Sequence, residues 1–177
     1  MTGLKFANSL TAGIDSEGTL TLTGVTIDGG YSGIVIDGGT GLIQTTRVTH
    51  AGVFGIEVIN VGHATITSSE VIENSNLGVV VSEGSATITD SRLTDNDHGL
   101  IVTNEGVVTI SNSSLADNRV RALENASATD TVDAANNWWG TADELLIDGM
   151  TRGHVDFTPY FGADTDLDGG SRGFVGD

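Results

Sequence analysis

The sequence predicts an all-β solenoid, a parallel β-helix in which about 22 residues form each coil. The first observation is an internal repeat: HATITSSEVIENSNLGVVVSEG at residues 63–84 is followed directly by SATITDSRLTDNDHGLIVTNEG at residues 85–106. The second is the pattern within each repeat, where alternating β-branched residues bounded by Gly, Asn, Asp and Ser favour short strands over helices. The third is that each short strand offers one inward aliphatic residue, whereas a leucine-rich repeat needs several leucines at fixed offsets.

The strand that opens each repeat supplies the first ladder of inward residues. Its central aliphatic recurs at spacings of 21, 23, 22, 22 and 22, at Leu22, Ile43, Ile66, Ile88, Ile110 and Val132. If Ile66 points inward, Thr65 and Thr67 point outward, because successive side chains of a strand lie on opposite faces. Coils stacked at about 4.8 Å bury this ladder, which contributes roughly 1.5–3 kcal/mol for each buried aliphatic.

Two further series complete the coil. A second aliphatic position lies five residues after each of the first five, at Ile27, Val48, Val71, Leu93 and Leu115. A third series precedes a short aliphatic strand in each repeat and consists of Gly33, Gly55, Gly78 and Gly99, continued by Ala122. Three short strands in each coil therefore pair with the next coil and satisfy nearly every backbone group.

Asparagine recurs with the same period. Asn74, Asn96 and Asn118 lie 22 residues apart. Stacked amides can hydrogen-bond from one strand to the next, as asparagine ladders do in other stacked sheets. We interpret these residues as structural, at a bend of the coil.

The repeat pattern over residues 18–128 resembles that of right-handed parallel β-helix repeat proteins. This superfamily includes pectate-lyase-like enzymes, phage tailspikes and large surface proteins of bacteria and archaea. The resemblance implies one single-stranded right-handed β-helix domain over residues 1–177. Within it we expect an N-terminal coil or cap at 1–17, regular coils at 18–128, and a C-terminal coil and cap at 129–177.

The C-terminal segment resembles the closing segment of many secreted members of this superfamily. The similar stretches are NNWWG at 136–140 and VDFTPY at 155–160. An uncapped parallel stack exposes its core and its last strand edge. We therefore expect Trp138 and Trp139 to form an aromatic cap over the open end. The resemblance also implies an extracellular or cell-surface location.

Charge and composition exclude several classes of partner. Seven basic and 24 acidic residues give a formal net charge of −17, which repels phosphate backbones and acidic sugars unless a cation bridges them. Nucleic acid is excluded on this ground. The absence of cysteine excludes disulfides and thiolate metal sites. No apolar run approaches the roughly 20 residues that span a bilayer, and the first residues lack the basic and apolar regions of a signal peptide.

The last residues contain a candidate calcium site. Asp164, Asp166 and Asp168, followed by Gly169, match the D-x-D-x-D-G opening of a calcium loop, whose alternate carboxylates converge on one cation. The match is incomplete, because position 12 of such a loop is an acid and here is Val175. The same stretch resembles a terminal strand-turn motif of bacterial surface β-helices, TDLDG followed by an arginine. Calcium is thus a candidate ligand, and no cofactor is required.

The candidate catalytic residues are Asp95, Asp97 and His98. In an extended strand the two aspartates would stand about 6.5–7 Å apart, within the carboxylate separation of an inverting glycosidase. His98 and Gly99 resemble part of a polygalacturonase-like site, but the Arg-Ile-Lys segment of that site is absent. An exposed turn also leaves both acids ionised, whereas hydrolysis needs one to be protonated. The alternative interpretation is a pair of solvated turn acids.

These observations favour a monomeric, non-catalytic structural or adhesive segment of a secreted or surface protein, with carbohydrate as the candidate partner. The main alternative is a carbohydrate-active enzyme, a polysaccharide lyase or hydrolase, that uses a concave face. A groove that gathers carboxylates and a base would separate the two. A minor alternative is ice binding by the outward threonine rows, which contain Thr21, Thr23, Thr65, Thr67, Thr87 and Thr89.

Overall fold

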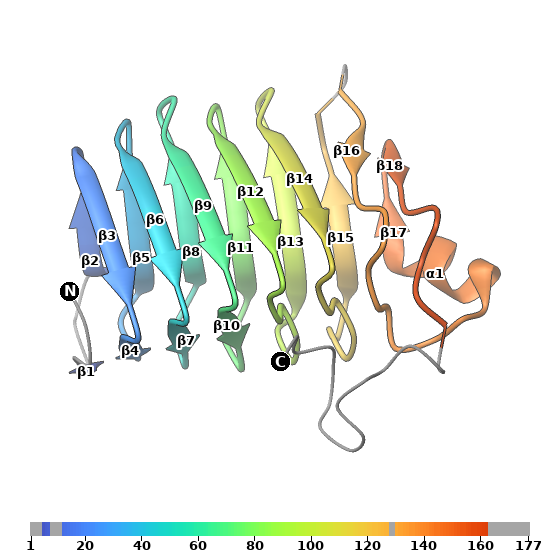
Figure 1. Ribbon diagram of the computed structural model, residues 1–177, viewed down its shortest axis with the longest axis horizontal. Coiled ribbons are helices and arrows are strands. Elements are labelled where there is room, and N and C mark those ends of the chain that lie inside the picture. The colour runs from blue at the N-terminus through green and yellow to red at the C-terminus, as the bar shows by residue number, and fades with distance from the viewer. Residues whose placement is uncertain (1–4, 8–11, 128–129, 163–177) are drawn as a thin grey trace.

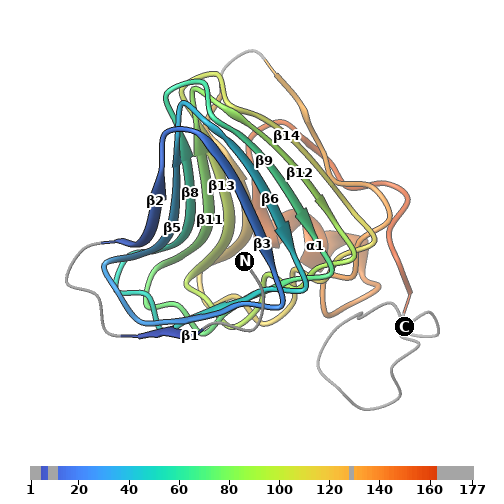
Figure 2. The same cartoon turned by 60° about the vertical axis from the view of Figure 1, so that its left-hand side comes forward.

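The chain forms a right-handed parallel β-helix of about six turns (Figure 1). The computed structural model describes residues 5–7, 12–127 and 130–162. Every strand pair described is parallel, as the stacking of like segments requires. In Figure 2 the three sheets are the three sides of the solenoid, and successive coils follow one another along its axis.

Each coil passes through the three sheets in the same order. The first sheet contains β2 (Ala12–Ser16), β5 (Ser32–Asp37), β8 (Phe54–Ile59), β11 (Leu77–Ser82), β13 (His98–Thr103), β15 (Arg121–Asn125) and β17 (Thr151–Arg152). The second contains β3 (Thr19–Thr23), β6 (Thr40–Gln44), β9 (His63–Thr67), β12 (Ser85–Thr89), β14 (Val107–Ser111), β16 (Val132–Asp133) and β18 (Val155–Asp156). The third contains β1 (Lys5–Ala7), β4 (Thr26–Asp28), β7 (Arg47–Thr49) and β10 (Glu70–Ile72), and isolated bridges through Arg92, Ser114 and Trp138 extend it.

The predicted ladder of the second sheet is confirmed except at its last position. Its aliphatics pair in register and are fully buried from Leu22 to Ile110. The prediction that Val132 follows Ile110 is wrong, because Thr109 pairs with Asp133 and the register therefore sets Val132 beside Val108 and Ala134 beside Ile110. Two extra residues precede β16, and a shift of two keeps the inward face inward because side chains alternate with period two.

The asparagine ladder is confirmed and lies between the third and first sheets. Asn96 Oδ1 accepts hydrogen bonds from the backbone N–H and the amide of Asn74, at 3.0 and 3.1 Å. Asn118 Oδ1 accepts in the same way from Asn96, at 3.1 and 3.4 Å. The ladder supplies partners to backbone groups that turn inward at this bend, where an unpaired group would be costly.

A second polar ladder, which the sequence analysis missed, lies at the bend between the second and third sheets. The backbone N–H groups of Thr46, Ser69 and Ser91 each donate to the hydroxyl of the following coil at 3.1 Å. Ser113 ends this series by donating to Asn137 Oδ1 at 2.9 Å. Hydroxyls at a recurring spacing of about 22 residues were the available signal, but surface serine and threonine are too common for it to be distinctive.

Glycine is required at the start of the first-sheet strands because neighbouring coils approach closely there. A Cβ added at Gly78 would lie 2.6 Å from the carbonyl oxygen of Gly99 and 2.8 Å from the amide nitrogen of Asn96. At Gly99 the corresponding atoms are the carbonyl oxygen of Ala122 and the amide of Asn118, both at 2.6 Å. The glycine series therefore makes room for the asparagine ladder.

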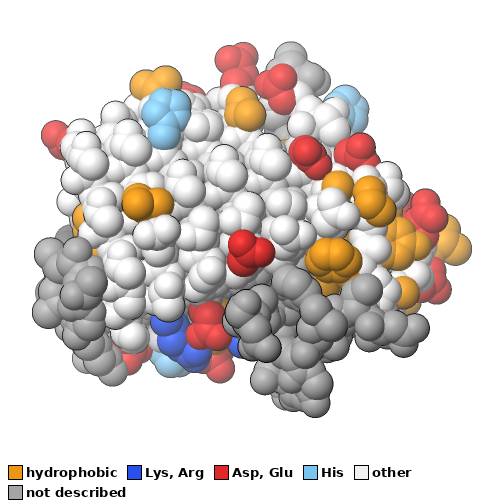
Figure 3. All heavy atoms as spheres, viewed as in Figure 1, with side chains coloured by type: hydrophobic (Ala, Val, Ile, Leu, Met, Phe, Trp, Pro, Cys, Tyr) orange, Lys and Arg blue, Asp and Glu red, His pale blue; other side chains and the backbone are white. Residues whose placement is uncertain are grey.

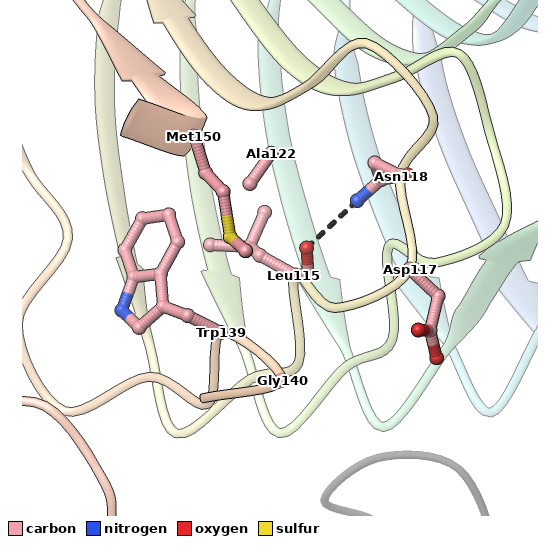
Figure 4. A pocket seen from close by; sticks show the side chains of 7 residues that line it. All are labelled: Leu115, Asp117, Asn118, Ala122, Trp139, Gly140 and Met150. Carbon is pink, nitrogen blue, oxygen red and sulfur yellow. Dashed lines mark hydrogen bonds between the residues drawn. The ribbon is translucent and has the colours of Figure 1, made fainter. Parts of the chain in front are cut away.

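The predicted aromatic cap is present, with different roles for its two tryptophans. Trp139 is 0% exposed and continues the inner ladder beyond Leu115, whereas Trp138 is half-buried and forms the last bridge of the third sheet. Phe157 packs edge-on against Trp139, at 6.1 Å between ring centroids. Figure 4 shows Trp139, Leu115 and Met150 around a cavity of about 170 Å³.

The short helix α1 (Glu144–Met150) lies at the C-terminal end of the stack (Figure 1). Asp143 caps its first turn by accepting a hydrogen bond from the backbone N–H of Leu145, at 3.0 Å. Ile147 is the buried residue of this helix and joins the core. In the part of the chain that the structure describes, no helix is long and apolar enough to cross a membrane.

Candidate functional site

The outer side of the first sheet forms a concave face. Figure 2 shows its strands bending near their N-terminal ends, and the hydroxyl of Ser32, before the bend, lies 3.4 Å from the carboxylate of Glu57, after it. One column of outward residues precedes the bend and contains Ser32, Phe54, Leu77, His98 and Arg121. A second column follows it and contains Asp15, Val35, Glu57, Val80, Ile101, Glu124 and Arg152. We call this surface, with its two columns, the concave face.

Two outward valines of the concave face are sheltered from solvent. Ile34 and Ile36 belong to the core, so Val35 between them points outward, yet it is 8% exposed. Val80 lies in the same position two strands further on and is also 8% exposed. On a flat or convex sheet, outward aliphatic side chains would be exposed to solvent. We therefore attribute the low exposure of Val35 and Val80 to the bend of the sheet.

Aromatic side chains border this apolar strip. Phe54 is half-buried in the first column and meets Tyr31 edge to face, at 6.2 Å between ring centroids. Tyr31 is 57% exposed. Large rings that are held in place and partly exposed are typical of surfaces that bind ligands, because they offer contact area at a low entropic cost.

Glu57 is the most perturbed acid of the concave face. Its carboxylate accepts a hydrogen bond from the hydroxyl of Ser32, which is 3% exposed, at 3.4 Å. Burial raises the pKa of Glu57, and the charges of Asp15 and Asp37 raise it further, while the hydrogen bond opposes the shift. Among the described residues no cation forms an ion pair with Glu57, so a half-buried negative charge is left without a positive partner.

Glu124 lies in the same column in a different environment. Its two carboxylate oxygens lie 3.3 Å from a guanidinium nitrogen of Arg152 and 3.8 Å from Nδ1 of His98. His98 Nδ1 is buried and has no hydrogen-bond partner. This corner of the face is therefore neutralised by residues of the chain itself.

The spacing along the column decides which chemistry the acids can share. Glu57 and Glu124 are three strands apart, which corresponds to about 14 Å at the spacing of neighbouring strands. Glycosidases hold their two carboxyl groups about 5–9.5 Å apart, so these two glutamates cannot act on one glycosidic bond. Asp37 is closer to Glu57, one strand and two residues away, a diagonal of about 8 Å.

The predicted catalytic pair has another arrangement. The extended geometry assumed for Asp95 and Asp97 is wrong at Asp95, whose φ of 59° places it in the left-handed region. Glu73 and Asp117 have the same conformation one coil before and one coil after, so Asp95 occupies a turn position that repeats along the stack. His98, the third candidate, starts β13 and lies in the concave face.

Asp97 is engaged by an arginine of the next coil. Its carboxylate accepts two hydrogen bonds from Arg119, and these bonds, followed by the arginine's charge, lower the pKa of Asp97. An acid held ionised in this way is a poor proton donor at neutral pH. Asp97 is thus ion-paired with Arg119, and the interpretation of the two aspartates as solvated turn acids stays a prediction.

On the third sheet, the arginines whose side chains are described are paired with acids. Glu70 lies between Arg47 and Arg92 and forms an ion pair with each of them. Glu73 also lies 3.6 Å from Arg47. Acids of the same or neighbouring coils neutralise these arginines, so the described part of this sheet offers no unpaired basic cluster for an acidic polysaccharide.

Figure 3 shows that the outer face of the second sheet carries few charged side chains, with one acidic group near the middle of the view. From β3 to β14 its outward positions hold no Asp, Glu, Lys or Arg. Thr65, Thr87 and Thr109 form a regular row in register, but Leu42 interrupts it before Thr21. The threonine row is thus regular over three coils and interrupted at Leu42, and a role in ice binding remains a prediction.

The candidate calcium ligands Asp164, Asp166 and Asp168 lie outside the described residues. Within the ranges that are described, no group of three or more histidines and acids is arranged to hold a metal ion. Calcium binding by the C-terminal residues remains a prediction.

Sequence reasoning missed Glu57 and Glu124, although a signal was present. The strands after the glycine series read GIVI, GIEV, GVVV and GLIV, and ALEN continues them. Glutamate therefore replaces an aliphatic residue at the same position in two repeats. Alternation alone assigns that position to solvent, where glutamate is ordinary, and only the bend of the sheet makes it a sheltered site.

A match to a protein-family model agrees with this architecture. Residues 11–138 match the model of the family described as the right handed beta helix region. Among solved structures, the crystal structure of pectate lyase Pel9A is similar at a TM-score of 0.34 and 14% sequence identity, over 84% of this chain. The chain spans 56% of the length of that lyase chain. No curated protein matches the sequence.

Proposed function

Because the chain belongs to the family of the right-handed β-helix region, we propose that it is a non-catalytic, adhesive segment of a secreted or cell-surface protein that binds carbohydrate on its concave face. The family fixes the scaffold, and one scaffold carries many functions, so the proposal depends on the site. The observation that carries it is the sheltered apolar strip of Val35 and Val80 beside the rings of Phe54 and Tyr31.

This combination suits a sugar chain that crosses several coils. The C–H faces of sugar rings pack on aliphatic and aromatic groups, and their hydroxyls need hydrogen-bonding groups at the border. Glu57 and Glu124 in the second column and Ser32 in the first supply such groups. Ordered strands hold all of these side chains, which reduces the entropic cost of binding.

The distances favour binding over cleavage. Glu57 and Glu124 are too far apart to cooperate, and Glu124 is already paired with Arg152. His98, the candidate general base on the concave face, lies next to Glu124 and not next to Glu57. The carboxylates and the base are therefore present but divided between two places.

The enzymatic alternative depends on one observation, the pair formed by Glu57 and Asp37. A raised pKa suits a general acid, and the diagonal of about 8 Å lies within the range of inverting glycosidases. In that alternative Glu57 would protonate the leaving group and Asp37 would activate water. Release of reducing ends that is abolished by Glu57→Gln would establish it.

The test is a glycan-array and polysaccharide-cleavage screen with the wild type and two matched variants. Val80→Asp places a charge in the apolar strip, while Thr87→Asp makes the same kind of change on the second sheet. We expect binding without cleavage, lost in Val80→Asp and kept in Thr87→Asp. Binding lost only in Thr87→Asp would move the site to the second sheet.

A further inference from the structure

We infer that the carbohydrate held by the concave face is cationic, an amino-sugar polymer whose ammonium group pairs with Glu57 while its ring lies on Val35 and Val80. This inference rests on the proposed function and specifies its ligand. Its basis is the contrast between Glu57 and two other acids on strand faces, Glu70 and Glu124.

Two other acids that point out from strand faces have a cation supplied by the chain. Glu70 has Arg47 and Arg92, and Glu124 has Arg152. Over the described residues, Glu57 has the hydroxyl of Ser32 and no cation. A half-buried carboxylate without a positive partner is costly, and an ammonium group of a ligand would remove that cost.

The acids near Glu57 also favour a positively charged ligand. Asp15 lies two strands away in the same column, and Asp37 lies on the diagonal, and both act on Glu57 through their negative charge. An acidic sugar would be repelled here by three carboxylates, and by the net charge of −17 of the whole chain. A neutral sugar would leave Glu57 unpaired.

The two valines beside Glu57 indicate that the ligand carries its cationic group on a ring with an apolar face. Val35 and Val80 flank Glu57 on the two adjacent strands, so a ligand that reaches the carboxylate also covers them. A small inorganic cation would not use this surface. A sugar ring with an amino substituent presents an apolar face and an ammonium group together.

The experiment compares two probes of equal length, a glucosamine hexamer and an N-acetylglucosamine hexamer, by titration calorimetry at neutral pH. We expect the wild type to bind the glucosamine hexamer about tenfold more tightly or better, since a charge-assisted hydrogen bond is about twice as strong as a neutral one. Glu57→Gln should abolish this preference. Glu105→Gln, which removes the same charge from an exposed turn, should keep it.

Lower pH gives an independent measurement. Because the pKa of Glu57 is raised, its carboxylate is protonated at a higher pH than an ordinary glutamate, and the preference should disappear there while the amino groups stay charged. A preference that persists below the pKa of an ordinary glutamate would contradict the role of Glu57.

The outcomes separate this inference from the proposed function. Equal affinity for both hexamers, with binding still lost in Val80→Asp, would overturn the cationic ligand and leave carbohydrate binding intact. Binding of neither hexamer nor any array glycan would overturn both. Binding of a lysine hexamer in place of the glucosamine hexamer would show that the face recognises basic peptides, and would also overturn the inference.

Discussion

Asn96 Oδ1 accepts hydrogen bonds from both the backbone and the side-chain N–H groups of Asn74, one coil away. Its own amide donates to the carbonyl oxygens of Val71 and Thr94, at 3.0 and 3.1 Å. A single buried side chain thus joins two coils and satisfies several inward backbone groups.

Removal of this amide should destabilise the fold strongly. Asn96→Ala leaves buried donors and acceptors unpaired, each at a cost of about 1–3 kcal/mol, so we expect a large fall in the free energy of unfolding measured with urea. Asn104→Ala, at an exposed turn, loses a hydrogen bond to Ser82 that water replaces. Similar losses in the two variants would refute the importance of the ladder.

The assignment of inward and outward side chains in the second sheet can be tested at two adjacent positions of β12. Ile88 is fully buried and Thr87 is exposed. Ile88→Asp buries an unpaired charge and should prevent folding, whereas Thr87→Asp should change stability by about 0.5 kcal/mol or less. Circular dichroism and thermal melts measure both, and a less stable Thr87→Asp would contradict the register.

Glu57 should make stability depend on pH in a defined direction. Burial raises its folded pKa above the unfolded value of about 4.3. Between the two pKa values the folded protein holds a proton that the unfolded chain has released, so the free energy of unfolding falls as pH rises through this window. We therefore expect Glu57→Gln to have a higher urea midpoint than the wild type at neutral pH, and an equal one below the unfolded pKa.

The control for that prediction is Glu105→Gln. This change removes one negative charge from an exposed turn, and any gain from a lower net charge will appear there as well. A gain of equal size in both variants would mean that burial of Glu57 has no effect on stability.

The ion pair of Asp97 and Arg119 makes the opposite prediction. The folded pKa of Asp97 is lowered, so its contribution is present above the unfolded value of about 3.9 and is lost as pH falls through the folded pKa. An NMR titration of the Asp97 carboxyl should give a midpoint below that of ordinary aspartate. Arg119→Gln should raise this midpoint and Arg152→Gln should not; no response to Arg119→Gln would refute the assignment.

Salt should stabilise the fold at low concentration. The acidic side chains that give the net charge of −17 repel one another along the stack. Added sodium chloride screens that repulsion beyond a Debye length of about 8–10 Å. We expect the urea midpoint to rise between about 10 mM and 150 mM salt, where screening changes most. Sucrose at equal osmolarity is the uncharged control, and a flat response to salt would disprove the electrostatic explanation.

The sequence by itself determined the coil. Periodicity was sufficient because each inward residue, such as Ile66 or Ile88, repeats the same local environment, and stacking like residues in register is the arrangement that buries them all. The asparagine ladder followed from the same reasoning. The period failed at Val132, where a shift of two residues keeps the inward face inward and so leaves no trace in the pattern.

Only the tertiary structure decided where the candidate site lies. Alternation places Glu57 and Val80 on the outer face of their strands. Nothing in the sequence distinguishes an outer face that is exposed to solvent from one that is sheltered. The bend of the first sheet makes that distinction, because it brings residues before and after the glycines together across the angle. The exposure of a side chain, and with it the pKa of Glu57, depends on the curvature of several coils together, which no single repeat encodes.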